Sequence, residues 1–286
     1  MMQTVPRIDD GIALPDGRWL AYAEFGDPEG RPVLFFHATP GYRRNPWATD
    51  AELRSAGVRL IAPDRPGVGR STPQPHRRLL DWPDDVRQLA DALALQRFAV
   101  VGFSNGGPHA AACACKLGPR VSGTALVAPL PPLDAPGAVR QLGVPDWYYP
   151  LARRAPWALR AVYAGLVALA RRDPRRAERL LVSGMSQADR RLFGRPEWAG
   201  RFGADLAGAG SRGIADDERL MPLPWRFAPE QVEGPVRLWL GEHDELVPAR
   251  VWLERPSPFP VCDTTVVAGA GHFLIAEQMA EIVGTV

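Results

Sequence analysis

The sequence predicts an α/β fold with a mostly parallel central sheet, helices on both faces of the sheet and an inserted helical cap. Short apolar runs alternate with helix-compatible stretches up to residue 130 and again from residue 236 onward, and this alternation is typical of parallel sheets. Between these two parts, helix-forming stretches follow one another without a strand-like run. We therefore expect a core made of residues 1–130 and 233–286 and a cap made of residues 131–232.

Local signals support each expected element. Asp16-Gly17 is a turn signal between two short runs and predicts a hairpin within residues 11–26. Asp81, which can cap a helix, and an early Pro83 predict a helix over residues 81–93. The apolar runs expected as buried strands are 32–36, 58–62, 98–101, 121–128, 236–240 and 264–267. The other expected helices are 47–56, 105–117 and 274–283 in the core and, in the cap, pieces near 150–171, 174–192 and 197–207.

The composition is that of a soluble globular protein. Of the 286 residues, 46% are hydrophobic and 23% are charged, which is ordinary for this class. The net charge of +2 argues neither for nor against a partner, but no basic recognition motif is present, so we expect no nucleic-acid partner. The expected partner is a small-molecule substrate. No apolar run is long enough for a membrane span and no signal-peptide pattern occurs, which predicts a cytoplasmic protein without a membrane partner. The three cysteines lack metal-binding spacing, so no metal is expected, and the oligomeric state stays open.

The reacting residue is expected where the predicted strand at residues 98–101 ends in a glycine-rich turn. The sequence Gly102-Phe103-Ser104-Asn105-Gly106 matches the G-x-S-x-G pattern of a sharp strand-to-helix turn. The two glycines remove the Cβ atoms that would clash where strand and helix cross. The serine hydroxyl projects from the top of the sheet in such a turn, so Ser104 is the candidate nucleophile. A base and an acid must support it, because the pattern alone is weak.

A serine hydroxyl is a poor nucleophile at neutral pH and needs a general base that a carboxylate orients. His272 follows the last predicted strand, and histidine titrates near neutral pH, so His272 is the candidate base. Asp244 follows the preceding strand and is the preferred acid, with Glu242 and Glu245 as the near alternatives. Four other histidines compete with His272 for this role. We interpret His37 as bracing its loop and His76 as solvated. We interpret His109 as packed on a helix and His243 as pointing away from the acid.

Acyl transfer also needs N–H donors that stabilise the oxyanion. The turn places the backbone N–H of Asn105 at a helix N-terminus, which gives one donor. The second donor is expected from the loop at residues 37–41. Because Pro40 has no N–H, Thr39 or Ala38 must supply it, and Thr39 is preferred.

Taken together, these motifs resemble the α/β-hydrolase superfamily, in its capped, cofactor-free bacterial form. The resemblance implies Ser104 as nucleophile, His272 as base and Asp244 as orienting acid. It also implies Thr39 and Asn105 as oxyanion donors, and no cofactor. It covers nearly the whole chain and is specific for the fold but not for the substrate. The segments that carry it are 37–41, 64–71, 102–107, 241–244 with Val247-Pro248, and 271–273.

Two features bear on the reaction that the resemblance implies. The family usually has glycine where this chain has Ala38, and alanine would strain or shift the loop if that position required a positive φ. A serine nucleophile argues against the epoxide-hydrolase and dehalogenase branches, for which the resemblance would call for aspartate.

The leading hypothesis is hydrolysis of a carboxylic ester, lactone or related acyl compound through an acyl-Ser104 intermediate. The alternatives are a non-hydrolytic cyclase or lyase, an acyltransferase, or a binding protein that keeps the fold without turnover. Substrate contacts are expected from the loop at residues 37–41, from the turn at Ser104 and from the aromatic part of the cap. The residues expected to make them are His37, Ala38, Phe103, Trp147 and Tyr148.

Overall fold

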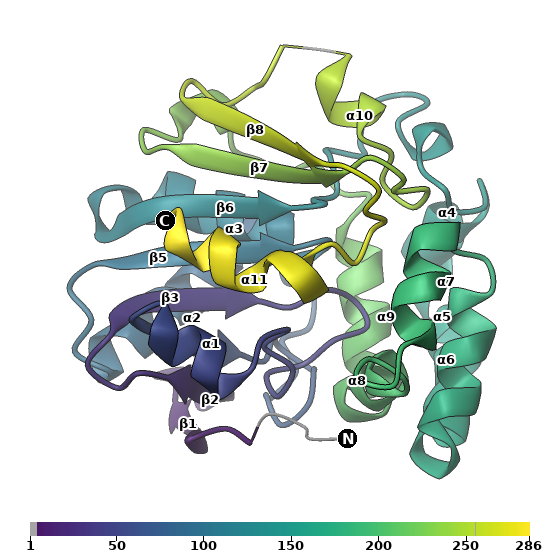
Figure 1. Ribbon diagram of the computed structural model, residues 1–286, viewed down its shortest axis with the longest axis horizontal. Coiled ribbons are helices and arrows are strands. Elements are labelled where there is room, and N and C mark those ends of the chain that lie inside the picture. The colour runs from purple at the N-terminus through teal and green to yellow at the C-terminus, as the bar shows by residue number, and fades with distance from the viewer. Residues whose placement is uncertain (1–4, 255) are drawn as a thin grey trace.

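The structure is a computed structural model, and over residues 5–254 and 256–286, which it describes, one eight-stranded sheet runs through the molecule (Figure 1). Its strand order is β1-β2-β4-β3-β5-β6-β7-β8. Strand β2 is antiparallel to both of its neighbours, and all the other pairs are parallel. This confirms the predicted mostly parallel sheet. The bounds are β1 Ile8–Ala13, β2 Trp19–Gly26, β3 Arg31–Phe36, β4 Val58–Pro63, β5 Phe98–Phe103, β6 Val121–Val127, β7 Val236–Gly241 and β8 Cys262–Val267.

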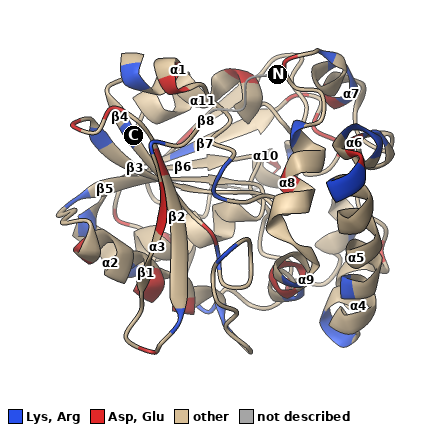
Figure 2. Ribbon diagram, turned by 90° about the horizontal axis from the view of Figure 1, so that it is seen from below, with Lys and Arg blue, Asp and Glu red and all other residues tan. Residues whose placement is uncertain are grey.

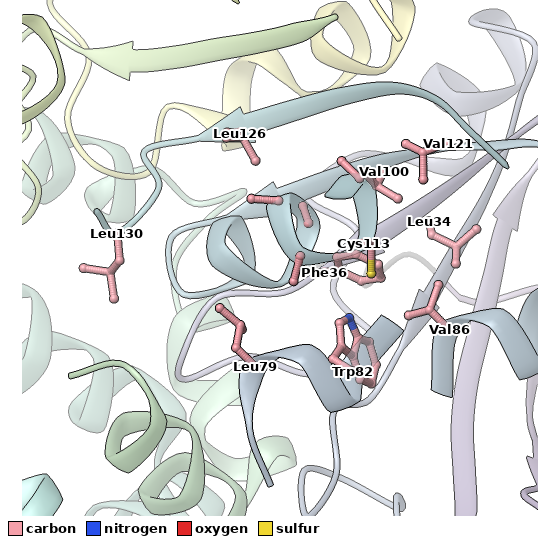
Figure 3. Close-up of a cluster of buried hydrophobic side chains, with 14 of the residues drawn as sticks. Leu34, Phe36, Leu79, Trp82, Val86, Val100, Cys113, Val121, Leu126 and Leu130 are labelled. Atoms are coloured by element: carbon pink, nitrogen blue, oxygen red, sulfur yellow. The ribbon is translucent and has the colours of Figure 1, made fainter. Parts of the chain in front are cut away.

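Helices cover both faces of this sheet, because successive side chains of a strand point to opposite faces. In β3, Leu34 and Phe36 join the cluster around Trp82 that Figure 3 shows. Val33 and Phe35 lie in a second cluster on the other face. Helices α2 (Trp82–Ala92) and α3 (Gly106–Leu117) cover the first cluster. Helices α1 (Asp50–Ser55) and α11 (Ile275–Gly284) cover the second one.

The chain between β6 and β7 contributes six helices, α4 to α9, which gather beyond the carboxyl ends of the parallel strands (Figure 1). We call residues 131–232 the inserted segment. A small core of its own includes Leu159 and Val167 of α5, Leu206 of α8 and Ile214 of α9. The bounds are α4 Tyr148–Arg154, α5 Pro156–Arg172, α6 Pro174–Val182, α7 Gln187–Gly194, α8 Arg201–Ala209 and α9 Ser211–Leu220.

The inserted segment differs in detail from the predicted helices. The piece expected near 150–171 is two helices, because Pro156 begins α5 and proline is favoured at a first turn. The piece expected at 174–192 is also two helices, because the Ser186 side chain accepts a hydrogen bond from Asp189 N and caps α7. Helix α9 was not predicted. It begins after Gly210, which has a φ of 77°.

Basic residues lie on the outer side of the inserted segment, as Figure 2 shows for α4 and α6. Arg171, Arg172, Arg175 and Arg176 are exposed there. No helix among the described residues is long and apolar enough to cross a membrane. The same residues hold no group of three or more His, Cys, Asp or Glu side chains that could bind a metal ion.

Candidate active site

The turn after β5 holds Ser104 in a strained backbone conformation. Its φ is 53°, in the left-handed region that side chains other than glycine and asparagine rarely occupy. The Ser104 N–H donates to the Val127 carbonyl of the neighbouring strand at 2.9 Å. A Cβ atom placed on Gly102 would lie 2.3 Å from the Gly106 carbonyl oxygen. The turn therefore requires small residues on both sides of the serine, as the sequence pattern predicts.

Ser104, His272 and Asp244 form a continuous hydrogen-bonded series. The distance from Ser104 Oγ to His272 Nε2 is 3.0 Å, and the distance from His272 Nδ1 to Asp244 Oδ2 is 2.8 Å. The other carboxylate oxygen of Asp244 accepts hydrogen bonds from the backbone N–H groups of Leu246 and Val247. All three members of the series are buried. The near alternative Glu242 is exposed and binds the N–H of Gly269 instead.

The surroundings of His272 favour its charged form. Burial lowers the pKa of this imidazole, but the charge of Asp244 and its hydrogen bond outweigh burial, so that the pKa is raised above 6.5. The charge of Asp189 acts in the same direction as that of Asp244. A proton taken from Ser104 by Nε2 would therefore be stabilised by two carboxylates.

Asp189 is a site residue that sequence reasoning missed. It is buried on α7, and its carboxylate accepts hydrogen bonds from the backbone N–H groups of His272 and Phe273 at 3.1 and 2.9 Å. Ser186-x-x-Asp189 matches the pattern of a helix start. That pattern predicts α7 but says nothing of the contact with the histidine loop.

Two backbone N–H groups next to Ser104 are candidates for oxyanion binding, that of Thr39 in the loop after β3 and that of Asn105 in the turn after β5. Within the part of the chain that the structure describes, the backbone N–H groups of Thr39 and Asn105 donate to no other group. Ala38 is not among the residues with a positive φ. Alanine in place of the usual glycine therefore adds no left-handed strain to this loop.

A buried ion pair ties this loop to the inserted segment. The Arg65 guanidinium donates to the carbonyls of His37 and Ala38 and to Asp217 Oδ2 on α9, the last at 2.6 Å. The Thr39 hydroxyl donates to the same Asp217 oxygen at 3.0 Å, and Arg77 pairs with the other one. Burial raises the pKa of Asp217, but the two guanidinium groups hold it well below the usual range. The sequence singled out the segment containing Arg65, but nothing in it indicated Asp217 as the partner.

A cavity of about 510 Å³ opens onto the serine. Ala38, Thr39, Asn105, Tyr148 and His272 line it together with Ser104, as expected from the sequence. Its further lining residues from the inserted segment include three that the sequence did not indicate, and these are Tyr149, Tyr163 and Glu218.

Three residues expected to contact substrate do not line this cavity. His37 begins the loop and is buried. Its Nδ1 donates to the Ala38 carbonyl, and burial lowers its pKa to about 3, so it is neutral. Phe103 is fully buried in the core beneath the His272 ring, with 5.3 Å between the ring centroids. Trp147 precedes α4 and is 61% exposed on the surface. Neighbouring residues on strands and helices point in different directions, which is why Tyr148 faces the cavity and Trp147 does not.

The remaining histidines are outside the series. His109 is buried on α3, where its Nδ1 donates to the Asn105 carbonyl at 2.8 Å. His76 and His243 are exposed. This agrees with the interpretation of His109 as a packed helix residue and of His76 as a solvated one.

Comparison with known proteins identifies similar chains. A non-heme chloroperoxidase from Streptomyces lividans is 31% identical over 155 residues, which cover 53% of this chain and 56% of that protein. A bifunctional esterase/perhydrolase from Acinetobacter calcoaceticus is 32% identical over 127 residues, covering 43% and 45%. The chain thus spans about half the length of the curated relatives it matches. The crystal structure of a putative aryl esterase from Burkholderia cenocepacia superposes with a TM-score of 0.72 over 97% of both chains, at 24% identity, which shows a shared fold.

A family model described as the alpha/beta hydrolase fold matches residues 31–278. This stretch runs from β3 to α11 and contains the turn at Ser104, Asp244 and His272. The chain therefore belongs to the α/β-hydrolase fold family.

Proposed function

We propose that this protein is a serine hydrolase that cleaves a carboxylic ester, a lactone or a related small acyl compound. The observation that carries the proposal is the hydrogen-bonded series Ser104–His272–Asp244 at the wall of a cavity large enough for a small molecule. This geometry matches the roles of nucleophile, base and orienting acid. The similarity to an esterase/perhydrolase agrees with acyl chemistry.

In the first half of the proposed reaction, Ser104 Oγ attacks the carbonyl carbon of the substrate while His272 Nε2 accepts the hydroxyl proton. The carbonyl oxygen becomes an oxyanion, which the free N–H groups of Thr39 and Asn105 stabilise. The ester bond to the leaving oxygen then breaks, and His272 returns its proton to that oxygen. The product alcohol leaves, and the acyl group stays on Ser104.

In the second half, a water molecule replaces the alcohol. His272 accepts a proton from the water as its oxygen attacks the acyl carbon, and the proton then returns to Ser104 Oγ as the carboxylic acid departs. Asp244 stays ionised throughout and stabilises the imidazolium that forms in both halves. The inserted segment serves as the cap, since it supplies Tyr148, Tyr149 and Tyr163 to the cavity wall.

A fluorophosphonate probe tests the nucleophile directly. We expect it to label wild-type protein at Ser104 and to leave the Ser104→Ala variant unlabelled. Ser183→Ala, which alters an exposed serine of the inserted segment, is the matched control and should label as wild type does. Absence of labelling in folded wild-type protein would refute the acyl-enzyme proposal.

The same variant separates hydrolysis from the alternatives. We expect Ser104→Ala to lower kcat for an ester at least about 10³-fold. Acyl transfer to an alcohol would appear as a transesterified product formed by wild type and lost with Ser104. A cyclase or lyase that uses only His272 and Asp244 would keep full activity in Ser104→Ala and lose it in His272→Ala.

A further inference from the structure

Glu218 is a buried carboxyl group in the cavity that the proposed acyl-transfer reaction does not use. It lies near the end of α9, is only 4% exposed and lines the same cavity as Ser104. Its Oε1 accepts a hydrogen bond from the Asn105 side-chain amide at 3.3 Å. Its Oε2 is buried and has no hydrogen-bond partner among the described residues. A buried polar atom left unpaired is costly, so this oxygen is available to bind a polar group inside the cavity.

The neighbour of Glu218 in sequence shows the opposite arrangement. Both carboxylate oxygens of Asp217 are engaged by arginine side chains, Arg65 and Arg77, away from the cavity. Among the residues that the structure describes, no arginine pairs with Glu218. The two adjacent carboxyl groups of α9 thus divide into one that is held in an ion pair and one that faces the cavity.

The groups around Glu218 come from three other elements. Tyr148 and Tyr149 belong to α4, Tyr163 belongs to α5, and Asn105 precedes α3. The hydroxyl groups of Tyr148 and Tyr163 are hydrogen bonded to each other at 2.6 Å. They form a polar corner in a cavity whose other lining residues include Leu142, Met185 and Phe202.

The surroundings keep this carboxyl group protonated at neutral pH. Burial is the main cause that raises the pKa of Glu218, to about 8, and the charge of Asp217 adds to it. Asn105, Tyr148 and Arg65 act in the opposite direction with less effect. At pH 7 the group is therefore mostly a neutral carboxylic acid, which is a hydrogen-bond donor as well as an acceptor.

We propose that Glu218 determines specificity by donating a hydrogen bond from its carboxylic acid to an uncharged oxygen atom of the substrate's acyl group. The contact of Glu218 with Asn105 places it beside the proposed oxyanion donors, so the recognised oxygen lies close to the reacting carbonyl. The preferred class is an ester or lactone whose acyl part carries a second oxygen, as a hydroxyl, ether or keto group. This inference rests on the proposed function and adds the substrate class to it.

Three p-nitrophenyl esters of equal chain length test the inference. The butyryl ester has no second acyl oxygen, the methoxyacetyl ester has an ether oxygen, and the β-alanyl ester has an ammonium group. We divide kcat/KM for each ester by its rate of hydroxide hydrolysis, because the substituents change intrinsic reactivity. Below pH 7 we expect wild type to favour the methoxyacetyl over the butyryl ester about fivefold, the size of one hydrogen bond.

Two variants of Glu218 separate hydrogen-bond donation from simple packing. Glu218→Gln keeps a donor that does not titrate, so we expect it to retain the methoxyacetyl preference at every pH. In wild type the preference falls as the pH rises through about 8, because Glu218 loses its proton. Glu218→Leu keeps the volume but has no donor, and we expect the preference to disappear.

A preference for the β-alanyl ester that increases above pH 8 and is lost in Glu218→Gln would overturn the inference. It would show that an ionised Glu218 binds ammonium groups. A methoxyacetyl preference that survives in Glu218→Leu would also overturn it, because another group would then recognise the oxygen.

A stability measurement distinguishes failure of this inference from failure of the proposed function. The folded protein holds the Glu218 proton up to about pH 8, whereas the unfolded chain loses it near the ordinary value, so the folded state binds more protons in between. The contribution of Glu218 to the free energy of unfolding must therefore decrease as the pH rises from about 5 to about 8. We measure the urea concentration at the midpoint of unfolding for wild type and for Glu218→Gln. We expect the difference between wild type and Glu218→Gln to fall as the pH rises across that range. A constant difference would refute a protonated Glu218 even if no ester is hydrolysed, whereas unreactive esters and an unlabelled Ser104 would refute the proposed function.

Discussion

The carboxyl edge of the sheet and the inserted segment contribute to the site in different ways. The edge supplies the hydrogen-bonded series, with Ser104 after β5, Asp244 after β7 and His272 after β8. The inserted segment supplies Asp189 and Asp217, which hold the backbone loops that carry the other groups. The difference indicates that the helices do more than cover a cavity. They bind the loop that carries His272 and the loop at residues 37–41.

The largest effect is expected from a change on the sheet edge. Asp244→Asn keeps the shape of the side chain but removes the charge that stabilises the His272 imidazolium and fixes its tautomer. We expect kcat to fall about 10⁴-fold with the fold intact. Glu242→Gln, at the exposed end of the same strand, is the control and should leave kcat close to wild type. Comparable losses in both variants would contradict the assignment of Asp244.

The inserted segment should show its largest effect in stability. Asp217→Asn leaves the buried guanidinium groups of Arg65 and Arg77 without a compensating charge. Breaking such a buried pair destabilises by about 3–5 kcal/mol, which urea unfolding measures. Asp216→Asn removes a long contact to the exposed Arg212 and longer-range charge interactions with Arg77 and Arg219, and we expect a loss below about 1 kcal/mol. Equal losses would show that α9 does not anchor the loop through Asp217.

Asp189→Asn tests the hydrogen bonds by which the inserted segment holds the backbone at His272. The asparagine amide has one uncharged acceptor oxygen, whereas the carboxylate of Asp189 offers two charged ones to the N–H groups of His272 and Phe273. We therefore expect kcat to fall about tenfold with little change in KM. The acid limb of kcat/KM should also move to lower pH, because the charge of Asp189 helps to raise the pKa of His272. Asp173→Asn, at the capping position of α6, is the control. If the acid limb of the kcat/KM profile stays at the same pH in Asp189→Asn, Asp189 has only a structural role.

The smallest effect is expected at Trp147. Its side chain is 61% exposed and outside the cavity, so Trp147→Ala should change stability by less than about 0.5 kcal/mol and leave kcat/KM as in wild type. Tyr148→Ala, one residue further on, removes a cavity wall and should raise KM. Equal effects of the two changes would contradict the orientation of α4.

The sequence was sufficient for the parts of the site that follow strands. Gly102 and Gly106 predict a turn that only small residues permit, and Asp244 and His272 follow strands whose carboxyl ends meet at one edge. Contacts made by helix faces left no such signal. Asp189, Asp217 and Glu218 look like ordinary helix acids in the sequence, and only the packing of α7 and α9 against the loops gives them partners. Similarly, Trp147 and Tyr148 are adjacent aromatic residues, and their different orientations depend on how α4 docks.

The inserted segment leaves the sheet after β6 and returns at β7, and these two strands are direct neighbours, with Val127 paired to Trp239. Because the two strands are parallel, the segment leaves at the carboxyl end of β6 and returns to the amino end of β7, where Val236 pairs with Thr124. A different helical segment can in principle be spliced between the same two strands without changing the strand order. Such a chimera would have to reproduce two acidic anchors, one for the histidine loop at the position of Asp189 and one for Arg65 at the position of Asp217. Its exchange is therefore limited by these two attachment points as well as by the length of chain needed to return along the sheet.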